Sequence, residues 1–321
     1  MELEAWHLLV LPLFFALGWA AARVDIRHLL RESRAVPASY FQGLNYLLNE
    51  QPDRAIEAFV EVAKVNADTL ELHYALGALF RKRGEIDRAI RMHQNLVDRA
   101  DLNQEQSLRA LYELGLDYMK AGLLDRAEDI FKRLQDGAHG LDARRNLLDI
   151  YVLEKEWEQA IAMAEQLERT GLPAQNAETA HYHCELALNA GLRQDTAAAR
   201  DHLQAALAKH RKSVRAAMQL GDLEAAAGND QAAIEAWRQV ESQNPAYLPV
   251  AASRLFQAYK RRGRADEGLS LLQAYLERYP SADLFHIVFG ILVESRGWGE
   301  ARALAAEALK RKLDKDPVAQ Q

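Results

Sequence analysis

Cysteine is almost absent from this chain of 321 residues, because Cys184 is the only one. A single thiol excludes a disulfide framework within the chain and a four-thiolate metal site. Glycine and proline are scarce, at 17 and 8 residues, and runs of β-branched residues are few. Good helix formers such as alanine, leucine, glutamate and arginine dominate instead, so the composition predicts an all-α protein.

An excess of basic residues is also missing. The net charge is −6 and the isoelectric point is near 6.0. General nucleic-acid binders gain affinity by neutralising phosphates, so the composition gives no support for a nucleic-acid partner. The P-loop, dinucleotide-binding, serine-hydrolase and zinc-protease motifs are absent too. We therefore expect neither an enzyme nor a cofactor.

Metal-ligand residue types gather in one place only, at His181, His183, Cys184 and Glu185. On a helix, His181 and Cys184 share a face, whereas His183 points elsewhere. Two ligands do not complete a zinc site. We predict a packed helix without a metal at this position.

The longest apolar run covers residues 5–22. As a helix it spans about 27 Å, close to the hydrocarbon thickness of a bilayer. Basic residues from Arg23 to Arg34 follow it, and acidic residues precede it, so the positive-inside rule places the later part of the chain in the cytoplasm. A cleaved signal peptide and a buried soluble helix are the alternatives. The residues that favour an anchor are Trp6, Pro12, Gly18, Trp19 and Arg23.

A small residue recurs along the rest of the chain at spacings of 33 to 39 positions. This period is that of the tetratricopeptide repeat, a helical hairpin of about 34 residues. The recurring residues are Ala55, Ala89, Ala127, Ala160, Ala199, Ala233, Gly268 and Ala301. Five positions before a recurring small residue the sequence has Gly84, Gly122, Gly228 or Gly263. Four positions after one it has Phe59, Phe131 or Trp237.

A generic helical bundle would not keep small residues, glycines and aromatics at fixed positions of one period. The sequence therefore predicts a tetratricopeptide-repeat solenoid of about eight hairpins over residues 36–315. A basic linker at 23–35 precedes the array, and a tail at 316–321 follows it.

A solenoid of this kind offers a concave groove lined by the first helix of each hairpin. Basic and aromatic side chains there can hold an acidic or amphipathic segment of a protein partner. The predicted groove residues are Tyr74, Arg81, Lys82, Arg109, Tyr112, Met119, Lys120, Arg145 and Met218.

The short apolar run with its arginine-rich linker and four further stretches are more specific than the repeat alone requires. The stretches are residues 43–48 (GLNYLL), 76–91 (LGALFRKRGEIDRAIR), 117–128 (DYMKAGLLDRAE) and 182–188 (YHCELAL). Together they resemble the lipopolysaccharide assembly protein B family, and the likeness covers essentially the whole chain.

The resemblance implies a single-pass protein of the bacterial inner membrane with its repeats on the cytoplasmic side. It implies an adaptor that restrains lipopolysaccharide synthesis by presenting the lipid A deacetylase to a membrane AAA+ protease. Other lipopolysaccharide assembly proteins are further partners of the family.

One departure from the family is large. Members end in a rubredoxin-like zinc ribbon with two C-x-x-C pairs, whereas this sequence ends at 316–321 without them. The chain is therefore either a fragment or a shortened relative, and no metal carries over.

Two other functions compete with the adaptor. One is a general scaffold or co-chaperone that grips acidic tails through Arg81, Lys82 and Lys120. The other is an enzyme with accessory repeats, for which the sequence leaves almost no residues.

Overall fold

The computed structural model describes residues 41–43, 45–46, 49, 51–65 and 70–314. The predicted anchor at 5–22, with Trp6, Pro12, Gly18, Trp19 and Arg23, lies outside the described residues, as do the linker at 23–35 and the tail at 316–321. Within the described ranges, none of the helices combines the length and apolarity needed to cross a bilayer.

The described part is all-α and contains no strand. Its helices are α3 (Pro52–Val65), α4 (Leu70–Arg83), α5 (Ile86–Val97), α6 (Gln104–Ala121), α7 (Leu124–Leu134), α8 (Gly140–Leu153), α9 (Trp157–Arg169), α10 (Asn176–Leu192), α11 (Thr196–Lys209), α12 (Val214–Ala226), α13 (Asp230–Gln243), the 3-10 helix η1 (Pro245–Tyr247), α14 (Leu248–Arg261), α15 (Ala265–Arg278), α16 (Ala282–Arg296) and α17 (Trp298–Asp314).

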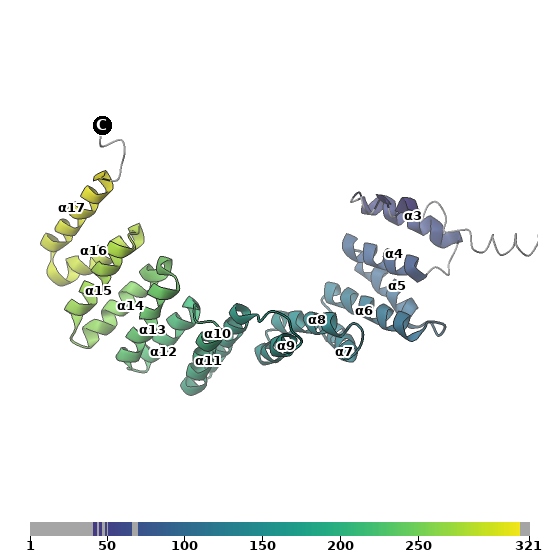
Figure 1. The fold of residues 1–321 in the computed structure, drawn as a ribbon, viewed down its shortest axis with the longest axis horizontal. Helices are drawn as coiled ribbons and strands as arrows, with labels where there is room; N and C mark the ends of the chain where they lie inside the picture. The colour runs from purple at the N-terminus through teal and green to yellow at the C-terminus, as the bar shows by residue number, and fades with distance from the viewer. Residues whose placement is uncertain (1–40, 44, 47–48, 50, 66–69, 315–321) are drawn as a thin grey trace, which may run out of the picture. The chain divides into compact units, whose positions relative to one another are not determined.

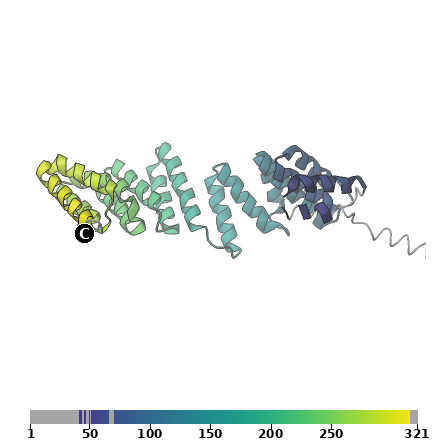
Figure 2. The ribbon, with the colours of Figure 1, turned by 90° about the horizontal axis from the view of Figure 1, so that it is seen from above.

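Consecutive helices form hairpins, from α4 with α5 to α16 with α17 (Figure 1). We call the earlier helix of each hairpin the first helix and the later one the second helix. Because Ala55 keeps the repeat register, α3 counts as a second helix. The described part of the chain divides into two compact units between residues 143 and 144, inside α8. Within the second unit the hairpins follow one another in chain order (Figure 2).

All eight recurring small residues lie on second helices, and each of them is buried. Hydrophobic clusters form around them, for example around Ala89 in the first unit and Ala233 in the second. The predicted repeat register is therefore confirmed, because every one of these small residues is buried on the second helix of its hairpin.

The turn between the two helices of a hairpin uses a left-handed residue. The four glycines predicted to close a first helix have φ between 71° and 86°. In the fourth and fifth hairpins the same position is held by Lys155 and Gln194, with φ of 60° and 61°. A left-handed conformation costs about 1–2 kcal/mol for a residue with a Cβ.

Replacing Lys155 or Gln194 by glycine is expected to raise the free energy of unfolding by about 0.5–1 kcal/mol each. The gain comes from relieving left-handed strain, less the extra entropy that glycine gives the unfolded chain. Urea denaturation followed by circular dichroism measures it. Gly228→Ala is the matched reverse change and should destabilise. A midpoint that falls in Lys155→Gly and Gln194→Gly would contradict the prediction.

Glycines inside the first helices have a different role, which is to admit a large side chain from the second helix. A Cβ on Gly115 would lie 2.9 Å from the Phe131 ring, and one on Gly221 would lie 2.3 Å from Trp237 Nε1. The same separation of sixteen positions joins Gly43 to Phe59 and Gly77 to His93. In each hairpin of this type, a ring of the second helix packs directly against a glycine of the first helix.

Candidate partner-binding surface

The predicted groove residues lie on first helices in both units. Lys82 on α4 and Lys120 on α6 are exposed, and Met119 is half-buried. In the second unit, Arg145 on α8 is exposed and Met218 on α12 is half-buried.

Tyr74 is buried and links two first helices. Its hydroxyl donates a hydrogen bond to the backbone oxygen of Gln106 at 2.7 Å. The Arg109 guanidinium lies 4.2 Å from the centre of the Tyr74 ring, so two of the predicted residues meet. Burial raises the pKa of the Tyr74 hydroxyl above its ordinary value of 10, against the opposing effect of the Arg109 guanidinium.

Arg81 is engaged by two carboxylates of the next hairpin. Its Nη2 lies 2.7 Å from Glu113 Oε2, and its Nη1 lies 2.7 Å from Asp117 Oδ1. Burial lowers the pKa of Arg81, but its hydrogen bonds to the two carboxylates outweigh this and leave the pKa raised. Arg81 is 18% exposed, so its charge is used mainly inside the chain.

His93 completes this buried network and is not among the residues predicted from the sequence. Its Nδ1 lies 2.5 Å from Asp117 Oδ2, and both side chains are fully buried. His93 occupies the register position that carries Phe59 or Phe131 in neighbouring hairpins. The sequence indicates a special role for His93, because a polar residue stands where the repeat elsewhere has an aromatic one. The network joins α4, α5 and α6, and it leaves His93 Nε2 without a hydrogen-bond partner.

Tyr112 forms an aromatic cluster at the end of the first unit. Its ring stacks on His139 at a centroid distance of 5.0 Å, and meets the edge of the Phe131 ring at 5.8 Å. The cluster holds Tyr112 half-buried on α6, with Arg109 one turn before it.

Some charges on the first helices of the second unit are paired with one another. Arg215 on α12 donates from Nη2 to Glu185 at 2.7 Å and from Nη1 to His181 Nδ1 at 2.6 Å. Met218 contributes through its backbone oxygen, which accepts a hydrogen bond from Trp237 Nε1 at 3.3 Å. These contacts tie α10 to α12 and α12 to α13.

The cluster considered for metal binding does not converge. His181 faces Arg215, whereas Cys184 is fully buried, and burial raises the pKa of its thiol to about 11. His183 turns toward His202 on α11, with 3.5 Å between their Nδ1 atoms. Across the residues that the structure describes, no group of three or more metal-ligand side chains assembles.

The His183 pair gives a pH prediction. Burial lowers the pKa of His183 below its ordinary value of 6.5, and His202 and Lys209 lower it further against the opposing effect of Glu165. As the pH falls below 6.5, His183 is therefore protonated to a greater extent in the unfolded chain than in the folded chain. This difference lowers the free energy of unfolding in acid. We expect the stability advantage of the unaltered chain over His183→Gln to shrink below pH 6.5. Urea denaturation at several pH values measures it, and a pH-independent difference would contradict it.

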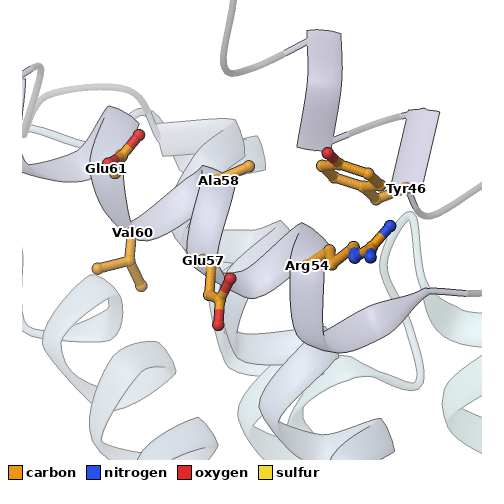
Figure 3. A pocket seen from close by; sticks show the side chains of 6 residues that line it. All are labelled: Tyr46, Arg54, Glu57, Ala58, Val60 and Glu61. Atoms are coloured by element: carbon orange, nitrogen blue, oxygen red, sulfur yellow. The ribbon is translucent and has the colours of Figure 1, made fainter.

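A surface pocket in the described part of the first unit lies near its start and has a volume of about 520 Å³. Its side chains diverge: Arg54 extends under the Tyr46 ring, while Glu57 and Glu61 point in other directions (Figure 3). This arrangement does not place an acid, a base and a nucleophile around one reacting atom.

Known proteins share both the repeats and the sequence. The tetratricopeptide repeat family matches residues 40–101, 79–141 and 184–247. Among solved structures, the C-terminal part of a TPR repeat-containing protein from Cytophaga hutchinsonii covers 77% of this chain and 98% of its own at 13% identity, with a TM-score of 0.48. A tetratricopeptide repeat protein from Parabacteroides merdae covers 79% and 96% at 11% identity, with a TM-score of 0.41.

Two relatives match nearly the whole chain. Lipopolysaccharide assembly protein B of Escherichia coli K12 is 36% identical over 312 residues, which cover 97% of this chain and 79% of the relative. The protein of the same name from Haemophilus influenzae is 30% identical and covers 96% and 79%. A scaffold of this kind binds proteins and is not an enzyme. The chain belongs to the lipopolysaccharide assembly protein B family.

Proposed function

We propose that this chain is a membrane-anchored adaptor that regulates lipopolysaccharide synthesis. In this proposal it presents the lipid A deacetylase to a membrane AAA+ protease, in contact with other lipopolysaccharide assembly proteins. The observation that carries the proposal is the 36% identity to lipopolysaccharide assembly protein B over 97% of the chain. The apolar run at 5–22 and the basic residues after it support an anchor in the bacterial inner membrane with the repeats on the cytoplasmic side.

The partner-binding residues of the proposal are those of the first helices. Lys82 and Lys120 are the best suited to a partner, because both are exposed, whereas Arg81 and Tyr74 make contacts within the chain. Arg109, Tyr112 and Met119 supply cationic, aromatic and apolar surface between them. The remaining members, Arg145 and Met218, are the proposed partner-binding residues of the second unit.

The proposal is tested in the bacterium that carries the chain. After protein synthesis is stopped, the half-life of the deacetylase is followed in cells with the gene, without it, and with a chain lacking residues 1–22. An adaptor for proteolysis predicts a longer half-life in both altered strains. An unchanged half-life after complete deletion would refute the function.

A general scaffold that grips acidic tails is the second candidate. The exposure of Lys82 and Lys120 favours it. A purified double variant, Lys82→Glu with Lys120→Glu, would then lose its partners in pulldowns irrespective of the membrane, while Lys212→Glu would keep them. Loss of binding without any change in the deacetylase half-life distinguishes a scaffold from the adaptor.

A further inference from the structure

A second surface lies on α3, α4 and α5, and none of the predicted groove residues lines it. It is a groove of about 440 Å³ between two second helices. Its floor is apolar and its rim on α5 is basic. The lining residues are Val60, Leu76, Phe80, Arg88, Arg91, Met92 and Asn95.

The floor of this groove consists of two fully buried side chains and two half-buried ones, all apolar. Leu76 and Phe80 of α4 are each 2% exposed and belong to the core of the first unit. Val60 of α3 and Met92 of α5 are half-buried and pack against that core. An apolar side chain of a partner can therefore be buried between Val60 and Met92 without rearrangement of the helices beneath.

The rim carries more positive than negative charge. Arg88 lies with its guanidinium 4.0 Å from the centre of the Phe80 ring, and it pairs with Glu85. Glu85 Oε1 also forms an ion pair with Arg83 Nε at 2.9 Å, so this one carboxylate pairs with two arginines. Arg91, one turn beyond Arg88, is exposed and forms no ion pair or hydrogen bond with any residue that the structure describes.

A cation at the Arg91 position is particular to α5. The other seven second helices carry an acidic or small residue two positions after the recurring small residue: Glu57, Asp129, Ala162, Asp201, Glu235, Ser270 and Ala303. The basic rim is thus not a general feature of the repeat. It distinguishes this groove from the corresponding position of every other hairpin.

We propose that this groove binds an acidic amphipathic helix of a protein partner. Arg88 and Arg91 are about 4.5 Å apart along the axis of α5, which is close to the pitch of one helical turn. A helix with carboxylates one turn apart can meet both arginines and place an apolar residue between Val60 and Met92. The surface is separate from Lys82 and Lys120, so the inference holds or fails independently of the adaptor function.

The test uses the full-length chain and a fluorescent synthetic helix. The peptide carries leucines along one face, at intervals of three and four, flanked by glutamates. One matched peptide has lysine in place of glutamate, and another has glutamine in place of leucine. Fluorescence anisotropy measures the dissociation constant of each. We expect the glutamate–leucine peptide to bind at least tenfold more tightly than either matched peptide.

Charge reversal then locates the site. Arg91→Glu is expected to weaken binding of the glutamate–leucine peptide about tenfold or more, because it replaces a charge-assisted hydrogen bond by repulsion. Arg133→Glu on α7 is the control, since that arginine is also exposed. Unchanged helicity in both variants shows that they fold.

Three outcomes would overturn the proposal. These are equal binding by Arg91→Glu and Arg133→Glu, equal binding of the lysine peptide, and loss of binding only when Lys82 and Lys120 are reversed. The last would place the peptide on the first helices and would leave the proposed function intact.

Discussion

Replacing Asp117 by alanine is expected to lower the free energy of unfolding by about 3–5 kcal/mol, the range for removing one partner of a buried charge pair. Asp117 is fully buried and joins Arg81 to His93. Without it, the guanidinium keeps only Glu113, and His93 has neither ring nitrogen hydrogen-bonded, because its Nε2 already lacks a partner. Urea denaturation followed by circular dichroism measures the loss.

The control for this prediction is Asp129→Ala on α7, where the aspartate is exposed. A surface change of that kind should alter stability by less than about 0.5 kcal/mol. A triple variant, Arg81→Met with His93→Leu and Asp117→Val, should recover most of the stability, because apolar residues of closer volume replace a buried ionic network. An Asp117→Ala loss no larger than that of Asp129→Ala would contradict the structure of the network.

The repeat register could be predicted from the sequence because it depends on local packing. A small residue is needed wherever the two helices of a hairpin cross, so Ala55 and Ala301 follow the same rule although they lie in different units. The left-handed turn was visible only where it is glycine. At Lys155 and Gln194 the same backbone conformation is adopted by residues that carry a Cβ, so the residue type does not indicate the turn.

The state of the groove residues could not be predicted, because it depends on partners in the next hairpin. The register places Tyr74 and Arg81 on the first helices, but Gln106 and Asp117, which bind them, lie 32 and 36 positions further on. A single sequence does not show that these charges and hydroxyls are used internally. Their contribution to partner binding stays a prediction, as does that of Lys82 and Lys120.

Replacing Trp237, the ring that packs against Gly221, is expected to cause the second large loss of stability. Trp237 is 2% exposed and packs within the main cluster of the second unit. Truncating it to alanine should cost about 3–5 kcal/mol, from lost burial and the cavity that remains. Urea denaturation measures the loss, and Trp298→Ala is the control, because that tryptophan is 71% exposed.

The effect of Gly221→Ala on the free energy of unfolding should change sign when Trp237 is replaced by alanine. In the unaltered chain, Gly221→Ala places a Cβ 2.3 Å from Trp237 Nε1, so overpacking should destabilise by about 1–3 kcal/mol. In the Trp237→Ala background the obstructing atoms are gone, and alanine exceeds glycine in helix propensity by about 1 kcal/mol. Gly221→Ala should then stabilise the chain. Effects that add within about 0.5 kcal/mol would show that the ring and the glycine do not lock the hairpin.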